Sequence, residues 1–311
     1  MEKYTENIIA LANIKGIGAA FMKQHINLIS LYRANLEMLS SLSNKINEED
    51  LYSNILKARE IINDCTTHGI KIISYLDADY PKLLLEIKDP PPVLYAKGNL
   101  ELLHKAIAVI GTRKSTELGN KIAKKVGQYF SEHWAICNGL VEGIDKHSIT
   151  NDDEVFFNVI GIISGGLNFE KTSSKITKEL AKKVLDRNGL LLSENEPNKK
   201  EDQFSGSKAS RIQAGLSKGL ILVQSSRNGG SKYTLKSFSE LNRPIGVIDF
   251  KTNSEFNNSD EFSGNRLLLT ELNQGLQKMC DIKSKELIKT REIIPISRNE
   301  DYKVFEDVLT I

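Results

Sequence analysis

At residues 106–116 the chain reads Ala-Ile-Ala-Val-Ile-Gly-Thr-Arg-Lys-Ser-Thr, an apolar run that passes through a glycine into hydroxyl and basic side chains. Five consecutive apolar residues are typical of a strand that is covered on both faces of its sheet. The polar stretch that follows, residues 117–130, has the spacing of an amphipathic helix. This order predicts a strand, a tight turn and a helix, which is the repeating unit of a parallel sheet.

The same unit recurs toward the C-terminus. Strands and helices that alternate are joined by right-handed crossovers, so the pattern predicts an α/β fold with an extended Rossmann-like, doubly wound, mostly parallel sheet. A polar loop is expected at 251–262 and a helix at 267–279. The further strands are expected at 135–137, 155–162, 190–192, 220–223 and 245–248, with helices such as 173–187 and 231–241 between them.

The first part of the chain has a different pattern, because its apolar residues recur at helical spacing without strand-like runs. We expect a small all-helical domain at 1–66, the sheet domain at 67–280 and a C-terminal extension at 281–311. Asn13-Ile-Lys-Gly-Ile-Gly18 predicts a tight turn between two helices. That turn is either a plain connector, which we favour, or a hairpin that holds a nucleic-acid phosphate.

Composition excludes several classes of protein. The 311 residues are 40% hydrophobic and 26% charged, unlike collagen-like or wholly disordered chains. The apolar runs are far shorter than the ~20 residues that cross a membrane, and no secretory signal is visible. Cys65, Cys137 and Cys280 are too dispersed for a disulfide framework or a zinc site. We therefore expect a cytoplasmic protein with no membrane association, metal or cofactor.

Basic residues are concentrated in the central part of the chain, although the net charge is only +2. Residues 105–125 hold six basic residues against one acid, 171–187 hold six against two, and 199–243 hold nine against three. This distribution favours an anionic partner. The alternative is that the lysines only solvate helix faces.

The turns that follow the strands are the candidate binding site, because a doubly wound sheet binds ligands at the carboxyl ends of its strands. In the first turn Gly111 allows a sharp bend, and the free amides of a helix N-terminus favour an anion. Hydroxyls there can donate to phosphate oxygens, and Arg113 can make a bidentate contact. The alternative for Ser115 or Thr116 is that it only caps the helix.

Four later turns share this character, and together they predict a strip of amides, hydroxyls and cations suited to a polyanion. Asp145 is expected to be a helix cap or a backbone anchor in the second turn and not a catalyst. Lys208 and Arg211, three residues apart, are expected to share one helix face. The residues that we expect to bind the anion are Gly111, Thr112, Arg113, Lys114, Ser115, Thr116, Gly139, Gly165, Gly166, Lys175, Lys208, Arg211, Gly230, Ser231 and Thr234.

These motifs resemble, in order, those of the DprA/Smf family of DNA-processing proteins of bacterial transformation. Gly111-Thr-Arg113 is similar to the family's Gly-Ser-Arg, and Asn138-Gly-Leu-Val-Glu-Gly-Ile-Asp145 is similar to its Ser-Gly-Leu-Ala-x-Gly-Ile-Asp. Further matches are Asp79-Tyr-Pro81, Leu191-Leu-Ser-Glu194, Arg211-Ile-Gln-Ala-Gly-Leu-Ser217, Gly230-Ser231-x-x-Thr234 and Ser263-Gly-Asn265. The resemblance implies a homodimer that binds single-stranded DNA in a basic pocket and hands it to the RecA recombinase.

The chain departs from the family pattern at several positions, which makes it a divergent member. Ala209 and Ser210 replace the first Arg and the Asn of the family's Arg-Asn-Arg, and Gln224-Ser225 replace its Glu-Ala. The family's frequent C-terminal winged helix is absent or reduced. Among Lys171, Lys175 and Lys178, the sequence does not determine which faces the pocket.

Three functions remain open at this point. The one we favour is a non-catalytic single-stranded DNA-binding protein in DNA uptake and recombinase loading, with Phe169, Phe204 and Tyr233 as candidates for base stacking. A second is a nucleotide phosphoribohydrolase of the related LOG family, whose motif ends in an acid where this chain has Ser237. The third is a sensor that binds a nucleotide-derived signal in a closed pocket.

Overall fold

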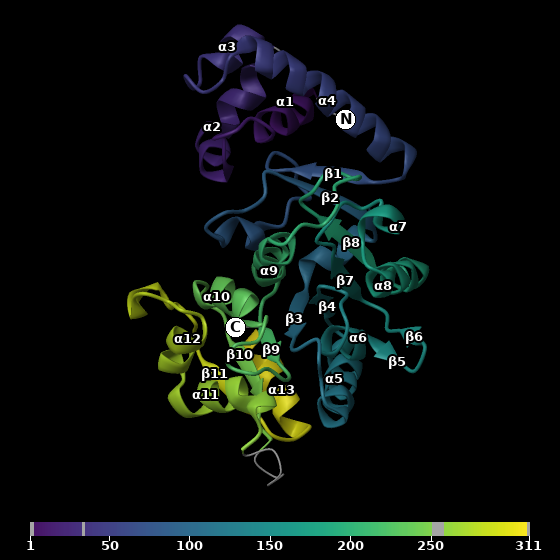
Figure 1. The fold of residues 1–311 in the computed structure, drawn as a ribbon, viewed down its shortest axis with the longest axis vertical. Helices are drawn as coiled ribbons and strands as arrows, with labels where there is room; N and C mark the ends of the chain where they lie inside the picture. The colour runs from purple at the N-terminus through teal and green to yellow at the C-terminus, as the bar shows by residue number, and fades with distance from the viewer. Residues whose placement is uncertain (1–2, 33–34, 251–257, 310–311) are drawn as a thin grey trace.

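A sheet of nine strands forms the centre of the molecule in the computed structural model, which describes residues 3–32, 35–250 and 258–309 (Figure 1). Its spatial order is β1-β2-β8-β7-β4-β3-β9-β10-β11. All neighbours from β8 to β11 are parallel, and only β1–β2 and β2–β8 are antiparallel. The strands are β1 (Lys71–Ser74), β2 (Val93–Gly98), β3 (Ala106–Ile110), β4 (Ala135–Asn138), β7 (Val159–Ile162), β8 (Leu190–Ser193), β9 (Leu220–Leu222), β10 (Ile245–Ile248) and β11 (Ile293–Ile296).

Helices cover both faces of this sheet, so the expected doubly wound, mostly parallel fold is confirmed. One face packs against α5 (Glu117–Phe130), α6 (Ile144–Ile149), α8 (Lys175–Asp186) and α13 (Glu300–Leu309). The other face packs against α9 (Ser205–Leu216), α10 (Lys232–Ser239), α11 (Ser263–Glu271) and α12 (Asn273–Met279). None of the helices in the described residues has the length and apolar character needed to cross a membrane.

The strand β3 shows why its sequence is apolar throughout. Ile107 and Val109 point to one core, while Ala108 and Ile110 point to the core on the opposite face. Side chains alternate across a strand, so a sheet that is covered on both sides needs apolar residues at every position. The turn after this strand therefore begins at the buried edge between two helical layers.

The N-terminal region is helical, as its apolar spacing predicts. It consists of α1 (Lys3–Ala12), α2 (Ala19–Tyr32), α3 (Leu36–Ser40) and α4 (Glu48–Thr67). The turn predicted at 13–18 joins α1 to α2, and Gly16 adopts a positive φ of 89°, where a side chain would be strained. These helices lie beside β1 at one end of the sheet (Figure 1).

Two predicted elements are each interrupted in the structure. The run expected as one strand at 155–162 is divided between β6 (Glu154–Val155), which pairs with β5 (Thr150–Asn151) in a separate hairpin, and β7 of the main sheet. Asn158, at φ 61°, turns the chain between them. The helix expected at 267–279 is interrupted at Leu272, at φ 49°, which separates α11 from α12. Both predictions were wrong because apolar spacing does not reveal a single left-handed residue.

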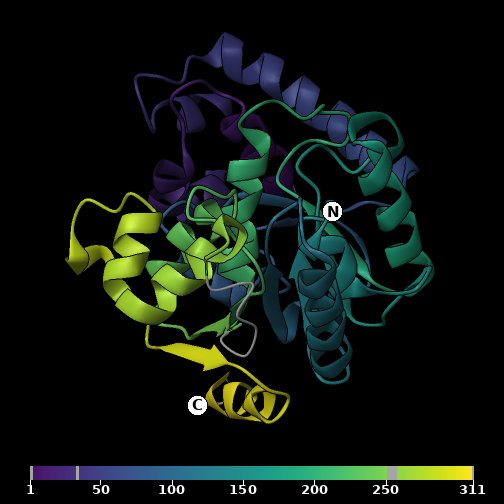
Figure 2. The same ribbon diagram turned by 60° about the horizontal axis from the view of Figure 1, so that its bottom comes forward.

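The last residues of the chain complete the main sheet. The strand β11 pairs in parallel with β10, and α13 follows it on the sheet edge (Figure 2). Phe305 is fully buried against Phe130 of α5, and the indole Nε1 of Trp134 donates to Glu306 Oε1 at 2.9 Å. Residues 281–311, which we expected as an extension, therefore supply one strand of the sheet. Residues 251–257 of the expected polar loop lie outside the described residues.

Candidate functional site

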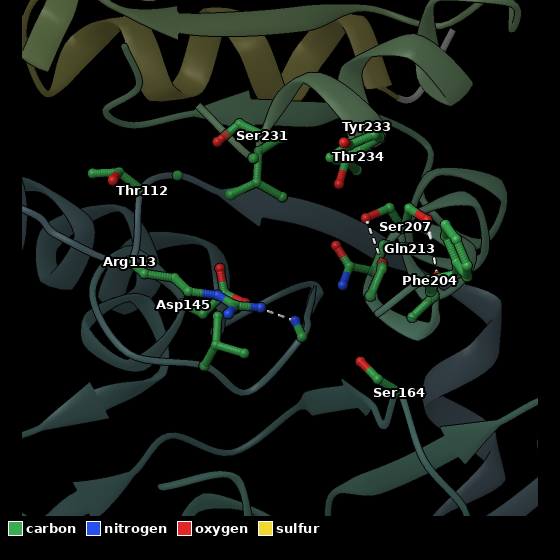
Figure 3. A pocket seen from close by; sticks show the side chains of 18 of the residues that line it. Thr112, Arg113, Asp145, Ser164, Phe204, Ser207, Gln213, Ser231, Tyr233 and Thr234 are labelled. Atoms are coloured by element: carbon green, nitrogen blue, oxygen red, sulfur yellow. Dashed lines mark hydrogen bonds between the residues drawn. The ribbon is translucent and has the colours of Figure 1, made fainter. Parts of the chain in front are cut away.

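A pocket of about 760 Å³ lies at the carboxyl edge of β3, β4 and β7, where ligands of this fold class bind. It is enclosed by the loops after these strands and by the first turns of α9 and α10 (Figure 3). Its lining includes eight of the residues predicted to bind an anion, namely Gly111, Thr112, Arg113, Lys114, Gly139, Gly230, Ser231 and Thr234. The fold therefore brings the first, second and last predicted turns to one cavity, together with Ser164 of the turn after β7 and residues of the turn that begins at Phe204.

The loop after β3 is fixed by two backbone hydrogen bonds at Thr112, and the two basic side chains that follow are available to a ligand. The amide of Thr112 donates to the Gln224 carbonyl at 2.8 Å, and its carbonyl accepts from the Ile144 amide at 3.1 Å. A Cβ on Gly111 would lie 2.4 Å from Ile144 Cγ1, so only glycine fits where the loop meets α6. Arg113 and Lys114 follow in exposed positions, and neither makes an ion pair with a described residue.

Ser115 and Thr116 do not line the pocket. Thr116 is the N-cap of α5: its Oγ1 accepts from the Gly119 amide at 3.1 Å, and its own hydroxyl lies 3.2 Å from Gln224 Oε1. The Ser115 hydroxyl donates to the Asn120 side chain. The geometry therefore supports the capping interpretation for Thr116, whereas the Ser115 hydroxyl is engaged by the Asn120 side chain and caps no helix amide.

Asp145 occupies the first turn of α6 and lines the pocket, although its side chain is almost fully buried. Its Oδ2 accepts from the Gly139 amide at 2.8 Å, which closes the loop after β4 as expected for an anchor. Burial raises the pKa of Asp145 from 3.8 to about 7, because desolvation outweighs backbone hydrogen bonds at Gly139 and Val141 and the charge of Arg113. The pocket thus contains a carboxyl group that titrates near neutrality.

The first turn of α10 presents unsatisfied polar groups to the pocket. Ser231 is 5% exposed, and its Oγ has no hydrogen-bond partner in the described residues. The amides of Gly230 and Ser231 likewise donate to no described acceptor. Thr234 adds a hydroxyl one turn further along the same helix. A buried hydroxyl beside free amides at a helix N-terminus is an arrangement that an anion satisfies.

Aromatic and amide groups line the pocket from α9, its N-cap Phe204 and α10. Phe204, at 59% exposed, and Tyr233, at 49%, both line the pocket and are available for stacking (Figure 3). Phe169, the third candidate, belongs to the hydrophobic core and is 8% exposed. Gln213 points its amide into the pocket, and the sequence analysis missed it because it stands alone within an apolar stretch.

Arg211 does not reach this pocket. Its guanidinium makes a bidentate contact with Glu194, at 2.9 and 2.6 Å, and its Nε donates to the Asp89 carbonyl at 2.9 Å. Both Arg211 and Glu194 are less than one-fifth exposed. Arg211 is thus turned toward the loops after β8 and before β2, Lys208 is exposed, and neither residue lines the cavity. Arg211 thus holds the fold together at the position where we expected a DNA contact.

Three further predicted residues also lie outside the lining. Gly166 packs against the loop after β8, where its Cβ would lie 2.0 Å from the Glu196 carbonyl oxygen. At Gly165, beside it, a Cβ would lie 3.0 Å from the Lys199 carbonyl oxygen. These glycines permit a close approach of two backbones and not of a ligand. Lys175 is almost fully exposed on α8 and faces Glu179, 3.9 Å away.

Ionisable groups in the lining are few. Among the described lining residues, only Arg113, Lys114 and Asp145 carry charge near neutral pH. No group of three potential metal ligands is found within the described residues. The pocket therefore combines two cations, one buried acid, free amides and hydroxyls, which is the composition of a phosphate site.

Comparison with known proteins identifies relatives of this architecture. The family described as DNA recombination-mediator protein A matches residues 71–285. The DNA processing protein DprA of Bacillus subtilis (strain 168) is 32% identical over 185 residues, which are 58% of this chain and 61% of that protein. The chain thus spans about three-fifths of the length of this relative.

Two solved structures share the fold. DNA processing protein A from Streptococcus pneumoniae superposes with a TM-score of 0.70 at 22% identity, covering 98% of each chain. DNA processing protein A from Helicobacter pylori, whose structure is described as showing a unique single-stranded DNA binding mode, superposes with a TM-score of 0.56 at 22% identity. That match covers 65% of this chain and 88% of the other.

Proposed function

The chain belongs to the DNA recombination-mediator protein A family, and we propose that it binds single-stranded DNA in the pocket at the carboxyl edge of β3, β4 and β7. The pocket would hold the sugar–phosphate chain by its amides, hydroxyls and cations. The Helicobacter pylori relative, described for its binding of single-stranded DNA, supports this ligand class.

The unsatisfied N-terminus of α10 is the observation that carries the proposal. Ser231 Oγ is buried without a partner, and the two adjacent amides have no described acceptor. An unsatisfied buried polar group costs roughly 1–3 kcal/mol, which a bound phosphate oxygen would recover. Arg113 and Lys114 reach the same cavity from the loop after β3, so one phosphate can be held from two sides.

Aromatic side chains favour a single strand over a duplex. Phe204 and Tyr233 line the pocket with about half of their surface exposed. Stacking of an unpaired base on such a ring contributes ~1–3 kcal/mol, and a base is accessible in this way only when it is not paired. The two rings therefore suit a strand whose bases are free.

We propose a binding role without catalysis. The loop that resembles the LOG motif lacks its terminal acid, because Ser237 stands at that position. The only carboxyl group among the described lining residues, Asp145, is held by the Gly139 amide as an anchor. A role in DNA uptake and processing, a homodimer, hand-over to a RecA-type recombinase and a cytoplasmic location are further parts of the proposal, and they rest on family membership.

The test is the salt dependence of binding to a labelled thymidine oligomer, measured by fluorescence anisotropy. Each phosphate neutralised on a single strand adds about 0.7 to the slope of log affinity against log salt. Arg113→Ala should reduce that slope by about 0.7. Arg298→Ala, which removes an exposed cation outside the pocket lining, is the matched control and should leave the slope unchanged. Equal slopes for wild type and Arg113→Ala would remove Arg113 from the mechanism.

A further inference from the structure

Gln213 is a buried amide whose side chain has no partner among the residues that the structure describes. It is 7% exposed and lines the pocket, and Figure 3 shows it directed into the cavity. Neither its Oε1 nor its Nε2 makes a hydrogen bond with a described residue, and neither atom is fully enclosed by protein. A desolvated amide without a partner is unfavourable, and a bound ligand can supply the missing hydrogen bonds.

The face of α9 that lines the pocket is built of small residues as far as Gln213. Phe204 is exposed at the start of this helix, and Gln213 lies about 13 Å further along its axis. Between them the hydroxyls of Ser207 and Ser210 donate to the Phe204 and Gly206 carbonyls, at 2.8 and 3.0 Å. Among the described α9 residues in the lining, Gln213 is thus the one whose side-chain donors are not yet engaged.

The position of Gln213 suits a base better than a phosphate. An ideal Cβ on Gly139 would lie 3.0 Å from Gln213 Nε2 and 3.2 Å from Asp145 Oδ2, so the amide and the carboxyl group lie on one part of the wall. A phosphodiester offers acceptors only, and it would leave Gln213 Oε1 without a donor. The edge of a nucleobase offers donors as well as acceptors, so it can satisfy both atoms of the amide.

We propose that Gln213 binds the Watson–Crick edge of one unpaired base, and that it thereby restricts the pocket to single strands without selecting a sequence. This inference rests on the proposed function and deepens it. Each of the four bases has a donor next to an acceptor on that edge, and a glutamine amide presents the complementary pair in either orientation. In a duplex the same edge is already paired, so it cannot satisfy Gln213.

The experiment compares two labelled oligomers of equal length by fluorescence anisotropy, one of thymidine and one of N3-methylthymidine. The two carry the same charge and similar rings for stacking, but the methyl group removes the donor from the Watson–Crick edge. We expect wild type to bind the methylated oligomer about tenfold more weakly, because Gln213 Oε1 then stays without a partner. A cytidine oligomer, whose edge also has a donor beside an acceptor, should bind wild type about as tightly as the thymidine oligomer does.

Gln213→Leu keeps the approximate size of the side chain and removes its polar atoms, so it should bind the thymidine and N3-methylthymidine oligomers equally. Gln213→Met, a second apolar replacement of similar length, should behave likewise if the leucine variant does not fold. Gln128→Leu is the matched control, because it makes the same change at an exposed glutamine of α5 that does not line the pocket. It should retain the tenfold difference, and thermal denaturation shows whether each variant is folded.

Three results would overturn the inference. They are equal binding of the two oligomers by wild type, a tenfold difference that persists in a folded Gln213 variant, and binding of the cytidine oligomer that is more than about tenfold weaker than that of the thymidine oligomer. Wild type that binds none of the oligomers at any salt concentration would instead refute the proposed function.

Discussion

Replacing Arg211 by methionine should destabilise the fold without changing how DNA binding depends on salt. Methionine keeps most of the apolar stem of arginine and removes the guanidinium. The change leaves Glu194, at 18% exposed, without its partner, and it removes four hydrogen bonds from the Arg211 side chain. Breaking a buried ion pair costs about 3–5 kcal/mol, and the remaining exposure of both partners places this loss at about 3 kcal/mol.

The assay combines thermal denaturation with anisotropy of a labelled thymidine oligomer. A loss of about 3 kcal/mol corresponds to a fall of roughly 5–10 °C in Tm for a chain of this size. The slope of log affinity against log salt should equal that of wild type, because Arg211 lies outside the pocket lining. The double variant Arg211→Met with Glu194→Met should recover much of the stability, since no unpaired charge remains. Unchanged stability together with a slope reduced by about 0.7 would refute this reasoning and return Arg211 to the DNA contacts.

Two further predictions concern glycine and the buried acid. Gly166→Ala should lower the free energy of unfolding by about 1–3 kcal/mol, because the added Cβ would lie 2.0 Å from the Glu196 carbonyl oxygen. Gly230→Ala is the control: no atom lies within 4 Å of its added Cβ, so the free energy of unfolding should change by less than about 0.5 kcal/mol. Equal effects of the two variants in urea denaturation would contradict this packing. Burial raises the pKa of Asp145 to about 7, above its ordinary 3.8, so the folded state holds a proton that the unfolded chain releases. Stability from this group is therefore present at low pH and is lost as pH rises from about 4 through about 7. Wild type should lose more stability between pH 5 and pH 8 than Asp145→Asn does, and parallel urea curves for the two would disprove it.

The sheet could be predicted where apolar runs and turn residues agree. The prediction of a strand at 106–110 followed by a helix at 117–130 matches β3 and α5. The prediction of a single strand at 155–162 was wrong because Phe156 and Phe157, although apolar, belong to the connection between two strands. Phe157 is 61% exposed and lies beneath the Arg187 guanidinium, 5.1 Å from its ring centre. The sequence alone does not distinguish an exposed aromatic side chain from a buried one.

Part of the pocket could be predicted because turns at strand ends can be recognised in the sequence. Turns at strand ends converge in any doubly wound sheet, so the contributions of Gly111, Gly139 and Gly230 followed from topology. The direction of a helix face did not follow, because it depends on contacts distant in sequence. Spacing predicts that Lys208 and Arg211 share a face, but only the position of Glu194 shows that this face is turned away from the cavity.

The strand β11 has a consequence for how this protein can be divided. The segment recognised as the family ends at residue 285, whereas the sheet ends with β11 at Ile296 and is closed by α13. A fragment that stops at the recognised boundary would keep every lining residue of the pocket and lose the partner of β10. It would also expose Phe130 and Trp134, which α13 covers. An unpaired strand edge beside exposed aromatic side chains can pair with a second molecule, so we expect this fragment to aggregate. The segment that the family model matches is therefore shorter than the segment that completes the sheet and covers its aromatic core.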